Sequence, residues 1–109
     1  MAAPGDRIFV SGTASLKEDG AVHAPGDAYA QTRHCFERIE QALAELGAAL
    51  SDVVRIWMFV TDISRWSEFG KAHREIFADH PPTSCMVEVG SLGIPELLIE
   101  IEADAVVDS

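Results

Sequence analysis

The chain has 109 residues, 48% of them hydrophobic, which is typical of one globular domain, and we expect that domain to span residues 1–109. Eight Lys and Arg against eighteen Asp and Glu give a formal net charge of −10 and a pI near 4.6. This charge repels phosphate backbones and anionic lipid surfaces, so the sequence predicts neither nucleic-acid nor membrane binding. No apolar run is long enough to cross a bilayer, and Met1–Arg7 lacks the pattern of a secretory signal, so we expect a cytoplasmic protein.

The first half of the chain predicts one strand, a minor strand and a helix. Residues 7–13 predict a short strand that ends at Gly12, and the turn residues 17–20 lead to a minor strand around Ala21 and Val22. Asp27 is a candidate N-cap for a helix from about Ala28 to Leu46. The apolar stripe of this helix recurs at intervals of three and four residues and comprises Thr32, Phe36, Ile39, Leu43 and Leu46.

The second half predicts a central strand, a second helix and two further strands. Residues 53–60 are largely apolar on both strand faces, one face holding Val54, Ile56, Met58 and Val60, so the strand must be covered on both sides. A helix follows from about Arg65 to Ala78, with Trp66, Phe69, Ile76 and Phe77 as its apolar stripe. Strands are then expected over residues 84–89 and 97–107.

The resulting order, β(β)αβαββ, predicts an α+β fold in which two helices cover one face of a mixed sheet. The second face carries Trp57 and Phe59, and exposing a large apolar side chain costs about 1.5–3 kcal/mol. The simplest cover for this face is another copy of the chain. The pattern therefore predicts a homo-oligomer.

The last strand carries three carboxylates on one face, namely Glu100, Glu102 and Asp104. Alternation alone leaves two interpretations open, a catalytic acid or a set of solvated or intersubunit acids. The two cysteines, Cys35 and Cys85, lack metal or redox spacing and are expected to be free thiols. We expect Cys85 to point towards the helix-covered face as a buried, inert thiol. The four histidines likewise show no metal-binding spacing, so no metal site is predicted.

Four segments together resemble the RidA (YjgF) family of small reactive-intermediate deaminases. They are "GDRIFVSGTAS" (5–15), "YAQTRHCFERIEQALAELGAALSDVVRIWMFVTDISRW" (29–66), "PPTSCMVEVGSL" (82–92) and "IEIEADAVV" (99–107). The resemblance implies a chorismate-mutase-like α+β fold assembled as a homotrimer, with small-molecule clefts between subunits. It also implies hydrolysis of enamines and imines, such as 2-aminoacrylate, to a keto acid and ammonia without a metal or organic cofactor.

The resemblance implies one catalytic residue, because the carboxyl that positions or activates water in the family is the first Glu of "EIEA", here Glu100. The family's backbone contact at the glycine of "SG" falls on Gly12, and Thr13 follows it. These three residues are therefore expected to line the cleft.

The family's substrate-clamping arginine is missing from the segment "PPTSCMVEV". Aligning "VEV" without gaps puts Ser84 at the position of the arginine and Met86 at the following Cys/Thr position. Sliding the alignment by one residue to match "SC" puts Thr83 there instead. Ser84 and Met86 are thus the expected substrate-binding residues of this segment, and Ser84 has no adjacent base in its motif.

The sequence leaves three functions open. The first is a homotrimer that hydrolyses small enamines, imines or related carbonyl metabolites. The second is a non-catalytic trimer that binds a small metabolite or a partner protein, which the missing arginine supports. The third, an endoribonuclease activity associated with some family members, is opposed by the net charge of −10.

Overall fold

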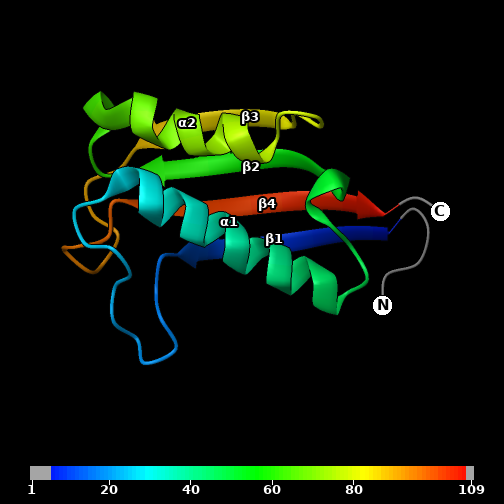
Figure 1. Cartoon of the computed structure of the whole chain (residues 1–109), viewed down its shortest axis with the longest axis horizontal. Coiled ribbons are helices and arrows are strands. Elements are labelled where there is room, and N and C mark those ends of the chain that lie inside the picture. Colours follow the sequence, from blue (N-terminus) through cyan, green and yellow to red (C-terminus); the bar gives the residue numbers. More distant parts are fainter. Residues whose placement is uncertain (1–5, 108–109) are drawn as a thin grey trace.

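The computed structural model describes residues 6–107 and places two helices on one face of a four-stranded sheet (Figure 1). In chain order the elements are β1 (Asp6–Ala14), α1 (Ala28–Glu45), the 3-10 turn η1 (Leu50–Asp52), β2 (Val53–Val60), the 3-10 turn η2 (Ile63–Arg65), α2 (Trp66–Ile76), β3 (Thr83–Glu88) and β4 (Ile99–Val107). The predicted α+β fold, a mixed sheet covered on one face by two helices, is confirmed.

The strands lie in the order β1-β4-β2-β3, and β4 pairs antiparallel with both β1 and β2. β3 pairs with β2 in parallel, so the chain crosses over through α2 between them. β3 is therefore an edge strand. The expected single domain over residues 1–109 stays a prediction, because residues 1–5 and 108–109 lie outside the described part, as does most of the segment Met1–Arg7.

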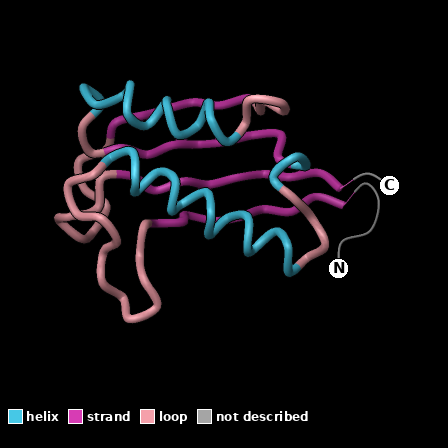
Figure 2. Tube along the Cα trace, viewed as in Figure 1, coloured by secondary structure: helices cyan, strands magenta, loops and turns pink. Residues whose placement is uncertain are grey.

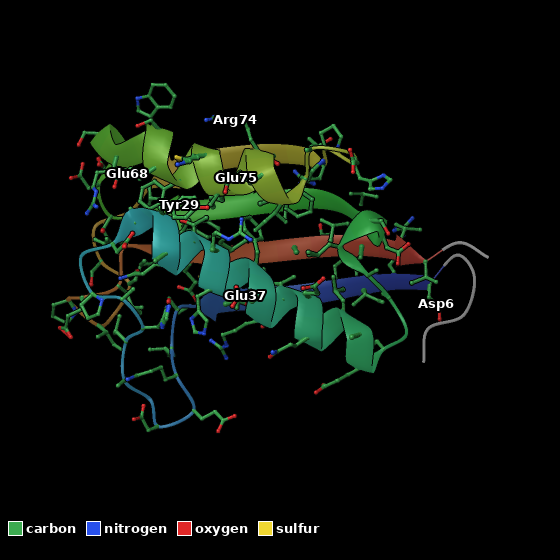
Figure 3. The ribbon with its side chains drawn as sticks, in the orientation of Figure 1. Asp6, Tyr29, Glu37, Glu68, Arg74 and Glu75 are labelled. Atoms are coloured by element: carbon green, nitrogen blue, oxygen red, sulfur yellow. The ribbon has the colours of Figure 1, made fainter. Side chains whose placement is uncertain are left out.

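The α1 helix begins where the sequence predicts, because the side chain of Asp27 accepts a hydrogen bond from the Ala30 N–H at 2.9 Å. Its buried stripe packs against β1, β4 and α2. Between the helices, the hydroxyl of Tyr29 donates to Glu75, which also forms a 3.2 Å ion pair with Arg33 (Figure 3). These contacts join the two helices on their solvent side.

β4 alternates between two environments. Ile99, Ile101, Ala103 and Ala105 are buried beneath the helices, whereas the three carboxylates point to the other side. We call that other side, opposite the helices, the open face. On β2 it carries Arg55, Trp57 and Phe59, which pair with the carboxylates of β4. The predicted split into an apolar face and an acidic face is confirmed for β4.

Three local predictions are wrong. The minor strand around Val22 is only a single bridge between Leu16 and Val22, within the loop 15–27 that extends beyond the sheet (Figure 2). Val54 is exposed, because an irregularity in the β2–β4 pairing places Val53 on the buried side instead. Trp66 is 60% exposed, because α2 begins at this residue after η2 and turns its first side chain to solvent.

Candidate functional site

Glu100 and Gly12 meet on the open face. β1 has one extra residue between Val10 and Thr13, a β-bulge that sets Ser11 and Gly12 against a single residue of β4. A Cβ built on Gly12 would lie 2.9 Å from the carboxyl carbon of Glu100, and closer still to Oε1. The absence of a side chain at Gly12 therefore makes room for the carboxyl group of Glu100.

Aromatic side chains flank this carboxyl group on β2. Phe59 pairs with Glu100, and Trp57 pairs with Glu102. The rings of Trp57 and Phe59 stack with centroids 6.3 Å apart, and the guanidinium of Arg55 lies 4.7 Å from the Trp57 ring. The open face thus offers the half-buried carboxylate of Glu100 beside two aromatic rings of β2. Further along the paired strands it offers the half-buried Asp104 opposite Arg55.

Thr13 points away from this cluster. It pairs with Ile101, a residue of the helix-covered face, and its hydroxyl donates to the carbonyl of Ser11 at 3.0 Å. Of the three residues expected beside one another in β1 and β4, the structure brings Glu100 and Gly12 together. It leaves the side chain of Thr13 on the other side of the sheet.

Ser84 and Met86 also face the helices. They pair with Ile56 and Met58, whose side chains are buried under α1 and α2, and Met86 packs against the same core. The expectation that they share a surface with Glu100 is therefore wrong within one protomer. Alternation along β3 shows only that successive side chains point to opposite faces of the sheet. The pairing of β3 with β2 decides which side chains lie on the helix side and which lie on the open face.

The same pairing overturns the prediction for Cys85, which is exposed and pairs with Trp57 on the open face. Thr83 pairs with Arg55, so it belongs to the open face as well. The alternative alignment that places Thr83 at the position of the family's arginine therefore matches the side of the sheet that carries Glu100. The guanidinium nearest to that position along the paired strands is that of Arg55.

The predicted free thiols are confirmed, and their environments differ. Cys35 is buried in α1, and burial raises its pKa to about 12, so it stays protonated at neutral pH. Within residues 6–107, no three His, Cys, Asp or Glu side chains come close enough to hold a metal ion. In the same range, no helix is both long and apolar enough to cross a membrane.

One polar pair escaped the sequence analysis. The Nε2 atom of His73 in α2 lies 2.7 Å from the Ser84 hydroxyl in β3, although the two residues are separated by the crossover between these elements. Burial lowers the pKa of His73, and the nearby guanidinium of Arg74 lowers it further. The sequence could not predict this contact, because the two residues share no recognisable motif. It becomes visible only when the positions of α2 and β3 in the fold are known.

Comparison with known proteins identifies the family. Residues 1–107 match the family described as Endoribonuclease L-PSP. The 3-aminoacrylate deaminase RutC of Acinetobacter baylyi is 37% identical over 98 residues, which cover 90% of this chain and 77% of that protein. A crystal structure from Mycobacterium tuberculosis, a member of the YjgF/YER057c/UK114 family, is 46% identical, with a TM-score of 0.84 and coverage of 96% of this chain and 82% of that one.

The YjgF gene product of E. coli gives a TM-score of 0.83 at 28% identity, over 96% of this chain and 84% of that chain. A mixed sheet with two helices on one face, together with these matches, assigns this chain to the class of small YjgF-type proteins. The chain belongs to the Endoribonuclease L-PSP family, that of the RidA/YjgF proteins.

Proposed function

We propose that the chain is a RidA-type hydrolase that converts small enamines or imines to a carbonyl compound and ammonia. The observation that carries this proposal is the carboxyl group of Glu100, held against Gly12 and paired with the aromatic residue Phe59. The deaminase named among the relatives supports the class of substrate, a small amino-substituted acrylate. A cytoplasmic location is part of this proposal.

Glu100 would act as the general base. Its carboxylate takes a proton from a water molecule as the water oxygen attacks the imine carbon, and an enamine first becomes an imine by protonation at carbon. Glu100 gives the proton taken from water to the imine nitrogen, which completes the carbinolamine. Glu100 then takes the proton of the new hydroxyl group and passes it to the amino nitrogen, so that the C–N bond breaks, ammonia leaves and the carbonyl forms. Imine and water become carbonyl and ammonia, so the reaction needs no metal or organic cofactor.

A homotrimer with clefts between protomers is part of this proposal. The open face carries exposed apolar side chains, with Phe9 72%, Val87 39% and Val106 36% exposed. These residues lie on three different strands, and leaving such a face in water is costly. Packing open faces of several copies together would bury them and enclose Glu100.

Arg55 is the residue we propose to hold a substrate carboxylate in place of the missing arginine. It lies on the open face, pairs with Thr83 and stacks on Trp57. Along β2 it is four residues from Phe59, the partner of Glu100, or about 13 Å at roughly 3.3 Å per residue. Because that distance exceeds one small substrate, Arg55 and Glu100 would have to come from two protomers.

The deciding experiment measures imine hydrolysis by the purified protein and by Glu100→Gln. Glu102→Gln is the matched control, because Glu102 lies two residues further along the same face of β4. We expect Glu100→Gln to lower kcat by about 100-fold, the usual contribution of a general base, without changing the oligomeric mass. Equal activity of both variants, or no hydrolysis of carboxylated and uncharged imines by the wild type, would overturn the proposal.

A second candidate is a non-catalytic trimer that binds a small metabolite or a partner. The observation that favours it is the uncharged pair Thr83 and Ser84 where the family resemblance calls for an arginine. Thermal shifts with small 2-keto or 2-amino acids, in the absence of any turnover, would support this candidate. Ribonuclease activity is not proposed, because a net charge of −10 opposes binding of a phosphate backbone.

A further inference from the structure

The contact between His73 and Ser84 lies on the helix side of the sheet, away from the open face. His73 belongs to α2 and Ser84 to the beginning of the edge strand β3. Their 2.7 Å separation is that of a good hydrogen bond between an imidazole nitrogen and a hydroxyl. The Ser84 oxygen is 3.4 Å from the carbonyl of Pro82, so the imidazole is the nearer acceptor for the single hydroxyl proton.

The imidazole is held by aromatic packing. Its ring centroid is 5.2 Å from that of Phe77 and 6.1 Å from that of Phe36, and both phenylalanines are buried. Burial keeps the pKa of His73 below its ordinary 6.5, and the charged neighbour Arg74 acts in the same direction. At neutral pH the ring is therefore uncharged and able to accept a proton.

A pocket of about 380 Å³ lies beside the imidazole of this pair and is lined by His73, Arg74, Phe77, Ala78 and Pro81. Three of these five residues are apolar, so the pocket suits a short hydrocarbon group. Figure 3 shows Arg74 and Glu75 on opposite sides of α2, with Glu75 towards α1, so Arg74 lies on the side of this helix away from Glu75. Ser84 is exposed, so a substrate can reach its hydroxyl.

We propose that Ser84 and His73 form a nucleophile–base pair that hydrolyses small esters with short apolar acyl groups. A serine is a weak nucleophile unless an adjacent base takes its proton, and a neutral imidazole within hydrogen-bond distance is the usual base. The distance between the Ser84 hydroxyl and His73 meets this requirement. The serine is also exposed, and the pocket beside His73 has room for a short acyl group. The pair is separate from Glu100, which lies on the opposite face of the sheet.

The reaction has two steps. In the first, the Ser84 oxygen bonds to the ester carbonyl carbon, its proton passes to Nε2 of His73, and the alcohol leaves with that proton. In the second, water gives a proton to His73 and its oxygen bonds to the acyl carbon, and Ser84 leaves as the proton returns to it. Ester and water become acid and alcohol, with no other reactant.

The test uses the full chain with p-nitrophenyl acetate and p-nitrophenyl butyrate. We expect Ser84→Ala and His73→Gln each to lower the rate by about 100-fold, whereas Ser67→Ala, an exposed serine on the same α2 helix, leaves it unchanged. The wild-type rate should rise with pH and level off near or below pH 6.5, as His73 loses its proton. Wild-type rates in Ser84→Ala would overturn the proposal.

A second measurement does not depend on the folding of any variant. The wild-type protein is treated with a fluorophosphonate, which modifies activated serines, and the modified peptide is identified by mass spectrometry. A phosphonyl adduct on Ser84 that is prevented by prior incubation with p-nitrophenyl butyrate is the expected result. An unmodified Ser84, or an adduct confined to other serines, would show that His73 does not activate it.

Discussion

The carboxyl group of Glu100 occupies the space in which a side chain on Gly12 would begin. The two residues belong to neighbouring antiparallel strands and meet at a bulge, and a Cβ on Gly12 would come within 2.9 Å of the carboxyl carbon. This distance is shorter than real Cβ atoms show. The position of the carboxylate thus depends on a backbone site that only glycine fills without displacement.

We predict that Gly12→Ala moves the carboxyl group of Glu100 and lowers imine hydrolysis at least about tenfold, with a loss of stability of roughly 1–3 kcal/mol from overpacking. The matched control is Gly90→Ala, because a Cβ there meets nothing within 4 Å. Urea denaturation and steady-state kinetics measure the two effects. Identical behaviour of both variants would contradict the steric relation between Gly12 and Glu100.

Gln31 is a fully buried amide, and we predict that it fixes the loops around the start of β4. Its Nε2 donates to the carbonyls of Ala24 and Glu96, and its Oε1 accepts from the Leu98 N–H at 2.9 Å. Gln31→Leu leaves these backbone groups without partners and should cost roughly 1–3 kcal/mol or more of unfolding free energy. The control Gln41→Leu changes an exposed amide of the same helix.

In chemical or thermal denaturation, Gln31→Leu should therefore unfold well before Gln41→Leu. Equal midpoints would mean that water replaces the lost hydrogen bonds at little cost.

The two cysteines should differ sharply in reactivity. Cys85 is exposed on the open face, whereas burial raises the pKa of Cys35 to about 12, which leaves almost no reactive thiolate near pH 8. We expect iodoacetamide to modify Cys85 in the isolated protomer and Cys35 only after unfolding. Peptide mass spectrometry with and without denaturant measures both.

Trimer formation through the open face adds a second expectation for Cys85. If the open faces pack together, the thiol is modified more slowly as protein concentration rises. Modification of native Cys35 at the rate of Cys85 would contradict the buried environment of the α1 thiol.

Acid should weaken the fold through His34. Burial and the adjacent ring of His23, with centroids 4.4 Å apart, hold the pKa of His34 below its ordinary 6.5. His34 therefore binds its proton less readily in the folded protein than in the unfolded chain, so its contribution to stability falls as the pH drops below about 6.5 and is constant above it. His73 contributes in the same direction.

We predict that His34→Gln reduces this loss of stability between pH 7.5 and 5, and His80→Gln, at an exposed loop position, is the control for replacing a histidine. Urea midpoints measured across this pH range give the slope. A midpoint that rises on acidification in the wild type would reverse the sign derived from the lowered pKa.

The sequence predicts most of the fold because the spacing of the apolar residues agrees, along much of the chain, with the turn and capping residues that end each segment. The alternation of β4, the stripe of α1 and the cap at Asp27 are local features, and each lies where expected except Leu46, which follows the end of α1 and is exposed. β3 was different, because "TSCMVE" is neither strongly apolar nor clearly one-sided. Which side Cys85 faces depends on the pairing of Trp57, a relation between distant segments that the local pattern does not contain.

The candidate site was predictable only in part for the same reason. Glu100 and Gly12 were predicted as site residues from family motifs that are present in this chain, and the structure brings the two residues together. Ser84 was assigned by alignment through a segment where the motif is broken, and a shift of one residue exchanges the two faces of a strand. The actual neighbour of Ser84 is His73, because the chain crosses over through α2 between β2 and β3. No residue spacing in the sequence predicts this contact.

The bulge in β1 has a consequence for how this chain tolerates changes of length. Val10 and Thr13 both lie on the helix side although they are three positions apart, because Ser11 and Gly12 together oppose one residue of β4. Deleting Ser11 or Gly12 would restore regular alternation, so Ile8 and Val10 would keep their places against the helices and Phe9 would stay on the open face. A one-residue deletion at the bulge would therefore leave the core of this strand in register and change mainly the surroundings of Glu100.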